Sequence, residues 1–315
     1  MLRDLYSCTG FLIISLTLFT SCSSDDNLST TPLEIETDNL ARLAAKELYV
    51  DYYKASKTNG SETQWSGNTT TCDPGAVPTD VMNKIFLRLQ YYRKAVGLEN
   101  TVTENIDQSA KAQKAALMMK SNNKLDHFPP ASWSCFTEEG SEAAGKSNLT
   151  MTKNAEAIDS YISEPGDSNG PVGHRRWLLY PRLRSIGVGN TNSSNAIWVV
   201  GNSGQEPSNM PEFIAWPPAG YVPGNVVFPR WSFSIPGADF SQAQVSMIDE
   251  NGKVIELNLE ELSLAYADPT IVWVPKGIKT NESIDTSYLV TIKSVALDGQ
   301  ILDYEYLVTL FNPED

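Results

Sequence analysis

The sequence of 315 residues has little histidine, little cysteine and a deficit of basic charge. No His-Glu-x-x-His motif is present, which excludes a zincin-type metalloprotease. No Cys-x-x-Cys pair is present, which excludes a structural zinc site of that kind. The formal net charge of −14 argues against nucleic-acid partners, because these need a basic protein face to displace counterions. It also argues against a polybasic membrane-binding surface.

The two histidines of the chain lie in segments that core packing does not explain. His127 lies in an Asp-His-Phe-Pro-Pro segment at the end of a helical pattern, and His174 lies in Gly-His-Arg-Arg-Trp after a Pro/Gly-rich turn. The carboxylates of Glu142 and Glu164 lie between them in the sequence. We expect these four side chains to line one cleft.

Three kinds of chemistry are open to such a set. Two neutral imidazoles can bind Zn²⁺ or a similar ion, with the carboxylates fixing the orientation of the rings. Without a metal, the same groups can act as general acid and base, because histidine titrates near neutral pH. In the third interpretation the side chains form a polar network that only stabilises the cleft.

The first residues predict an export signal. Arg3 and the apolar run 11–19 form a signal of ordinary length, which is too short to span a bilayer as a helix. The segment ending at Cys22 resembles the lipobox of bacterial lipoproteins, and this resemblance implies a signal peptide over 1–21 and a lipid on Cys22. Residues 23–26 resemble an export signal of surface-exposed lipoproteins. We therefore expect an outer-membrane lipoprotein exposed on the cell surface, with residues 22–34 as a flexible tether.

Cysteine usage agrees with export. Once Cys8 is removed with the signal and Cys22 carries the lipid, Cys72 and Cys135 remain as one pair. An even pair in an exported domain favours a disulfide. In the chain-entropy model, closing a loop of this length stabilises the folded protein by roughly 4 kcal/mol.

The pattern of apolar residues changes along the chain and predicts two domains, over 35–215 and 216–315. The first is α+β, with helices and one hairpin predicted at 35–57, 79–97, 107–121, 154–163, 185–189 and 196–200. Beyond a proline-rich junction, short alternating runs predict an all-β, immunoglobulin-like sandwich, with no helical stretch longer than 257–264. Its strands are predicted at 231–235, 244–248, 270–274, 288–292 and 304–311.

The order of these features resembles the CAP superfamily of cysteine-rich secretory proteins, antigen 5 and pathogenesis-related class 1 proteins. The resemblance covers about residues 80–201, with Ser141-Glu142-Ala143 where the family has Gly-Glu-Asn and Tyr161 where it usually has Trp. It implies an α-β-α sandwich with an open cleft lined by His127, Glu142, Glu164 and His174. Some members bind a divalent metal at the paired histidines, here His127 and His174, and some bind sterols or other lipids.

Three hypotheses about function follow. The first is a non-enzymatic protein, held at the membrane by its N-terminal lipid, that binds a lipid, a sterol-like molecule or a peptide in a metal-capable cleft, with the β-sandwich as a spacer or docking module. The second is a weak metal- or His/Glu-dependent extracellular peptidase, with Glu142 and Glu164 as catalytic candidates. The third is an adhesion module in which the β-sandwich makes the contact.

Overall fold

A computed structural model of the protein describes residues 32–280 and 282–315. The predicted signal peptide, the lipid on Cys22 and the tether up to residue 31 lie outside the described residues. Residues Pro32–Leu48 form helix α1, so the last three positions of the predicted tether are helical. Within the described residues, no helix has both the length and the apolar character needed to cross a bilayer.

The first part of the structure is built on a four-stranded sheet in the order β1-β3-β4-β2. The strands β3 (Ser185–Asn190) and β4 (Asn195–Trp198) form the predicted hairpin. Strand β2 (Ser147–Thr150) pairs antiparallel with β4, and the short β1 (Thr103–Glu104) pairs parallel with β3.

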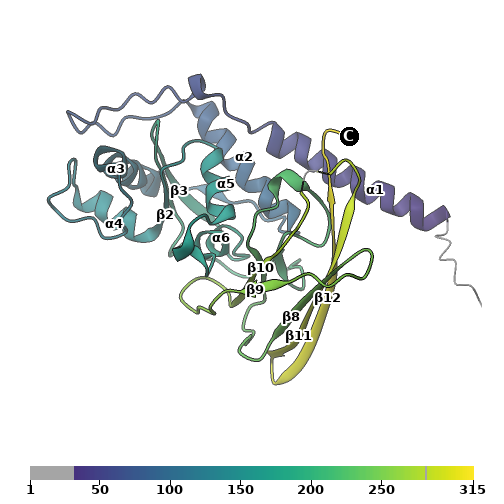
Figure 1. The fold of residues 1–315 in the computed structure, drawn as a ribbon. Coiled ribbons are helices and arrows are strands. Elements are labelled where there is room, and N and C mark those ends of the chain that lie inside the picture. The colour runs from purple at the N-terminus through teal and green to yellow at the C-terminus, as the bar shows by residue number, and fades with distance from the viewer. Residues whose placement is uncertain (1–31, 281) are drawn as a thin grey trace, which may run out of the picture.

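Helices cover both faces of this sheet. Successive side chains of β4 point to opposite faces and therefore pack into two different cores. Ala196 and Trp198 pack toward α3 (Ile106–Asn122) and α4 (Glu138–Lys146), whereas Ile197 packs toward α2 (Thr79–Ala95) and α5 (Glu156–Ser163). Figure 1 shows α3 and α4 on one side of β2 and β3, with α2 and α5 on the other. The predicted α-β-α arrangement is therefore confirmed.

Two glycines on β3 allow the close approach of α3. A Cβ on Gly189 would lie 2.1 Å from the carbonyl oxygen of Ala112, and a Cβ on Gly187 would lie 2.5 Å from the backbone of Gln108. Any larger residue would push the helix away from the sheet. The small alanine face of α3 therefore packs directly on the strand backbone.

The second part of the structure is all β. One sheet has the order β5-β7-β10-β9 and the other has the order β6-β12-β11-β8. Their bounds are β5 Ile214–Trp216, β6 Gly220–Pro223, β7 Trp231–Ser234, β8 Gln244–Asp249, β9 Leu257–Leu259, β10 Thr270–Pro275, β11 Thr286–Leu297 and β12 Gln300–Phe311.

Aromatic side chains join the two sheets face to face. Trp231 of β7 packs edge-on against Tyr288 of β11, with ring centroids 6.2 Å apart, and Phe233 lies 5.3 Å from Tyr304 of β12. Such contacts stabilise aromatic pairs beyond the area they bury. The predicted β-sandwich is confirmed, although the helical stretch expected near 257–264 is instead strand β9, paired with β10, and a loop.

The larger of the two buried clusters among the described residues is shared by both parts of the structure. It contains side chains of α2 and α5 together with side chains of both sandwich sheets. Tyr92 of α2 packs against Trp216 of β5, with ring centroids 4.9 Å apart. Strand β5 begins at Ile214, two residues before the boundary expected at residue 216.

The N-terminal helix adds a second junction between the two parts. The guanidinium of Arg42 on α1 lies 2.7 Å from the carboxylate of Asp285 and 4.9 Å from the ring of Phe311. Asp38 accepts a hydrogen bond from the hydroxyl of Tyr221. Figure 1 shows α1 beside the C-terminal strands, although the sequence assigned this helix to the first domain.

The cysteine pair and most of the helices form as predicted. The predicted helices are present, with α1 continued by a π-helical turn over Tyr49–Lys54. The sequence missed α4 and the short α6 (Gly173–Leu178). Cys72 and Cys135 form the predicted disulfide, which ties the long loop before α2 to the segment after α3.

Candidate functional site

A cleft of about 700 Å³ opens where the segment after α3, strand β2 and helix α6 meet a loop of the β-sandwich. Both histidines of the chain line it. We call it the histidine cleft. Its other lining residues include Phe128, Ser147, Asn148, Trp177 and, from the sandwich loop, Ala265 and Tyr266.

His174 is held by a buried carboxylate. Its Nδ1 lies 2.7 Å from Oε2 of Glu164, whose side chain is fully buried, while the His174 side chain remains 23% exposed. The other oxygen of Glu164 accepts a hydrogen bond of 2.9 Å from the backbone N–H of Arg175. Tyr161 packs against the His174 ring, with centroids 5.6 Å apart. The ring therefore has a fixed orientation.

The chain has strained backbone at Glu164 and Val172, the residues that flank the loop 165–171 before α6. Glu164 ends α5 with φ 51°, and Val172 precedes α6 with φ 48°. Left-handed backbone is costly for residues other than glycine, and most of all for a β-branched residue such as valine. Such strain is concentrated at functional sites. Here it turns the chain so that Glu164 meets the first turn of α6.

His127 lies in the loop after α3 and is exposed. Its Nδ1 lies 2.9 Å from the carbonyl oxygen of Ala144 at the end of α4. A carbonyl oxygen can only accept, so this nitrogen carries the proton. This contact joins the His127 loop to α4.

Both imidazoles are thus fixed in the same tautomer when neutral. Each uses Nδ1–H to donate to an oxygen, which leaves Nε2 with a free lone pair. Within residues 32–280 and 282–315, neither Nε2 has a hydrogen-bond partner from the protein. Nε2 is the atom that a metal ion, a ligand donor or a transferred proton would meet.

Glu142, expected in the same cleft, lies outside its lining. Its side chain is exposed on α4 and forms ion pairs with Lys111 at 2.7 Å and with Lys146 at 3.0 Å. The hydrogen bond from Lys111 holds the pKa of Glu142 below its ordinary value. Of the four predicted side chains, His127 and His174 line the cleft. Glu164 is fully buried behind His174 and lies outside the lining, and Glu142 lies on the surface.

Two residues of β2 line the cleft in its place. Asn148 donates from Nδ2 to the carbonyl oxygen of His174 at 3.1 Å, so it holds the start of α6 against the sheet. Ser147 is buried beside it, and its hydroxyl has no protein partner in the described part of the chain. The sequence analysis, which placed Glu142 in the cleft, missed both. It predicted no strand at 147–150, and no local pattern in the sequence marked these two residues.

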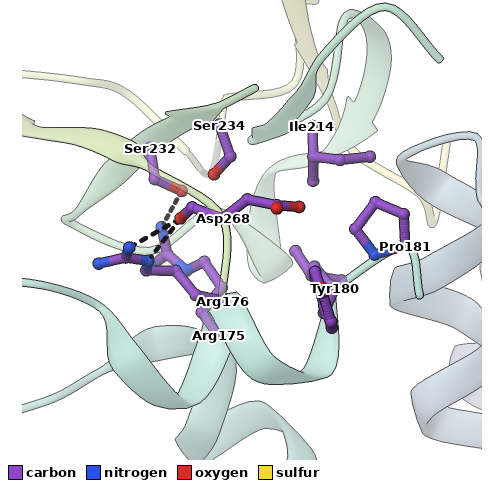
Figure 2. Close-up of a pocket in the computed structure, with 9 residues that line it drawn as sticks. Arg175, Arg176, Tyr180, Pro181, Ile214, Ser232, Ser234 and Asp268 are labelled. Carbon is purple, nitrogen blue, oxygen red and sulfur yellow. Dashed lines mark hydrogen bonds between the residues drawn. The ribbon is translucent and has the colours of Figure 1, made fainter. Parts of the chain in front are cut away.

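Behind α6 lies a second, much smaller cavity of about 10 Å³, roughly the size of one water molecule. Figure 2 shows it between Arg175, Arg176 and Tyr180 on one side and strand residues such as Ser232 on the other. The buried Arg175 donates from Nε to the carbonyl oxygen of Ile162 at 2.7 Å and from Nη1 to Ser232 at 2.9 Å. Burial lowers the pKa of Arg175 to about 10.

The donor set fits a divalent metal only in part. Nitrogen ligands with a hydrogen-bonded second ring nitrogen are the arrangement that metal-binding histidines adopt. His127 and His174 meet this condition. No group of three or more His, Cys, Asp or Glu side chains suited to a metal occurs among the described residues. Water or a bound ligand would have to complete the coordination.

One part of the chain matches a known protein family. Residues 87–202 match the CAP family, described as the cysteine-rich secretory protein family. The match runs from within α2 to just beyond β4 and includes both histidines and Glu164. It confirms the CAP-like region predicted from the sequence. The family and the disulfide are typical of secreted or extracellular proteins.

Comparisons over the whole chain give no further indication of fold or function. No curated protein matches the sequence. Among solved structures, CopC from Methylosinus trichosporium OB3b is 20% identical, with a TM-score of 0.23, and the match covers 32% of this chain and 92% of that chain. A TM-score this low does not support a common fold. The β-sandwich is instead established by the two four-stranded sheets of the structure.

The carboxyl group of Asp268 lies beside the small cavity, between the sandwich and α6, and its burial can be tested. Burial raises the pKa of Asp268 from 3.8 to about 6. The folded protein therefore keeps a proton that the unfolded chain releases, and ionisation of Asp268 lowers stability as pH rises from about 4 to about 6. Asp268→Asn removes this cost. We expect the variant to gain about 1 kcal/mol near pH 7, after allowance for partial exposure, and almost nothing below about pH 4.

Urea unfolding of both proteins at the two pH values measures this difference. Glu261→Gln, which changes an exposed acid of the same loop, is the matched control and is expected to show no such pH dependence. An equal effect of Asp268→Asn at both pH values would contradict the burial of this carboxyl group.

Proposed function

We propose that this is an extracellular, lipid-anchored protein without enzymatic turnover, and that it binds an amphipathic ligand, such as a lipid or sterol-like molecule, in the histidine cleft. The observation that carries the proposal is that two oriented imidazoles, His127 and His174, line one open cleft of about 700 Å³. Clefts of this size, with apolar walls and a few placed polar groups, are typical ligand sites.

The composition of the cleft supports an amphipathic ligand over a purely polar one. His127, His174 and the Ser147-Asn148 pair supply polar groups. Phe128, which is 84% exposed, and Leu125, which is 40% exposed, supply apolar surface at the same opening. Large apolar side chains left this exposed beside a cleft are typical of a ligand or partner site.

A divalent cation such as Zn²⁺ belongs to the proposal as an optional component. His127 and His174 would hold it through Nε2, while Ala144 and Glu164 keep the rings oriented. When bound, the ion would supply a Lewis acid that attracts an oxygen of the ligand.

Paired variants test the cleft. We expect His127→Ala/His174→Ala to lose bound zinc and to bind a panel of fatty acids and cholesterol about tenfold or more weakly than the wild type, because two of its polar groups are gone. Metal analysis and a lipid-binding assay on the mature protein measure both effects. Glu142→Gln, outside the cleft, is the control and should match the wild type. Binding of peptides alone, with no lipid bound, would favour a peptide ligand.

A hydrolase is the second candidate, because a buried carboxylate that orients a histidine is also the arrangement of a general base. His174 would take a proton from water through Nε2, and Glu164 would position the ring. Under the leading proposal, we expect no release of peptides from casein by mass analysis. Hydrolysis that disappears in His174→Ala and persists in Glu142→Gln would establish the second candidate instead.

The lipid anchor is proposed from the sequence around Cys22. We expect Cys22→Ser to move the protein from the membrane fraction to the soluble fraction, because the acyl chains are the only anchor in the proposal. Immunoblotting of fractionated cells measures the shift. Continued membrane association of Cys22→Ser would show that another segment attaches the protein.

A further inference from the structure

One wall of the histidine cleft is supplied by the β-sandwich. Residues 260–269 connect β9 to β10, and this loop contacts Arg176 of α6. Ala265 and Tyr266 of this loop line the same cleft as His127 and His174. A segment 92 residues from His174 in sequence is therefore part of its surroundings. Neither the composition of the sandwich nor the CAP match over 87–202 indicates such a role.

Tyr266 lies directly against the first residue of α6. A Cβ placed on Gly173 would be 3.0 Å from two ring carbons of Tyr266, which is closer than ordinary packing permits. Glycine at this position therefore lets the tyrosine ring reach the helix beside His174. The Tyr266 side chain is 37% exposed, so one part of the ring packs on the helix and another part faces solvent.

Arg176 fixes the shape of the loop. Its guanidinium donates to the carbonyl oxygens of Ser263 at 2.9 Å, Tyr266 at 2.6 Å and Asp268 at 2.7 Å. The same group lies 5.6 Å from the Tyr266 ring centroid. Arg176 is 5% exposed, and an arginine fork can hold several fixed acceptors where a lysine cannot.

Arg230 links the start of the loop to Glu164. Arg230 of the sandwich forms an ion pair with Glu260 at 2.7 Å and donates from Nη1 to the backbone carbonyl of Glu164. The loop, the buried carboxylate and His174 therefore belong to one connected set of contacts. The position of Tyr266 is set by the same helix that carries His174.

We propose that Tyr266 is a specificity-determining residue of the histidine cleft, that it contacts the apolar part of an amphipathic ligand and limits access to His174, and that Arg176 positions it. This rests on the ligand binding proposed above. The aromatic ring supplies apolar area at the polar end of the cleft. Its hydroxyl makes no hydrogen bond to the described residues, so its contribution is that of an apolar surface.

Ligand preference tests the contact. The probes are saturated fatty acids of increasing chain length and cholesterol. We expect Tyr266→Ala to bind the preferred probe about tenfold more weakly and to change the order of preference among probes. Tyr266→Phe should retain both affinity and order. Leu264→Ala changes a residue of the same loop that is 86% exposed and outside the cleft lining, and it should also match the wild type.

A second measurement needs no ligand. Diethyl pyrocarbonate modifies accessible neutral imidazoles, and with only two histidines in the chain each can be followed by mass analysis. We expect His174 to react several times faster in Tyr266→Ala than in the wild type, while the rate of His127 stays unchanged as an internal control. Arg176→Lys should also speed the reaction of His174, because lysine cannot hold the three carbonyl groups.

The two measurements separate the proposals. An unchanged His174 rate in Tyr266→Ala, or an unchanged order of preference, overturns the role of Tyr266. If the wild type binds no probe while His174 reacts faster in Tyr266→Ala, the amphipathic ligand is rejected and Tyr266 is retained as the residue that limits access to His174.

Discussion

The cleft depends on the contact between the buried carboxylate of Glu164 and the first turn of α6. A charged group without exposure is stable only when its oxygens are hydrogen-bonded. Glu164 meets this requirement through the His174 ring on one oxygen and the backbone N–H of Arg175 on the other. Both donors come from the first turn of α6, so the carboxylate fixes the direction of α6 and of the imidazole together. The left-handed backbone at Glu164 is the local cost of this arrangement.

Consecutive residues of α6 then connect the cleft to the rest of the molecule. His174 faces the cleft, Arg175 is buried against Ile162 and Ser232, and Arg176 holds the sandwich loop. Trp177 returns to the cleft lining. Because the two parts share a core and the helix contacts both, the sandwich is structurally part of the site. The sequence analysis expected the sandwich to be a spacer or docking module, and the contacts add that one of its loops also lines the cleft.

The sequence predicted what depends on local pattern. Periodic apolar residues located α2, α3 and α5, and alternation located most strands of the sandwich. It missed α6 because this helix has only six residues, too few turns to show a period. It missed α4 because the segment Glu138–Lys146 contains two glycines and, apart from Ala143 and Ala144, no apolar residue that could mark a buried face. Glu142 was placed in the cleft by motif order. Because α4 was not predicted, its ion pair with Lys146, one turn further along that helix, was not anticipated. The contacts of Arg176 with residues 263–268 join segments far apart in sequence, and no local pattern reveals them.

The two histidines have the same tautomer but different hydrogen-bond acceptors and different burial. His127 donates to a neutral carbonyl in an exposed loop, whereas His174 donates to a buried carboxylate and packs against Tyr161. A carboxylate behind an imidazole both orients the ring and strengthens it as a donor to a metal or a proton. His174 is thus the more buried and more constrained ring, and His127 is the more exposed one. In the proposed binding mode, the polar end of the ligand would meet the rigid His174 ring first.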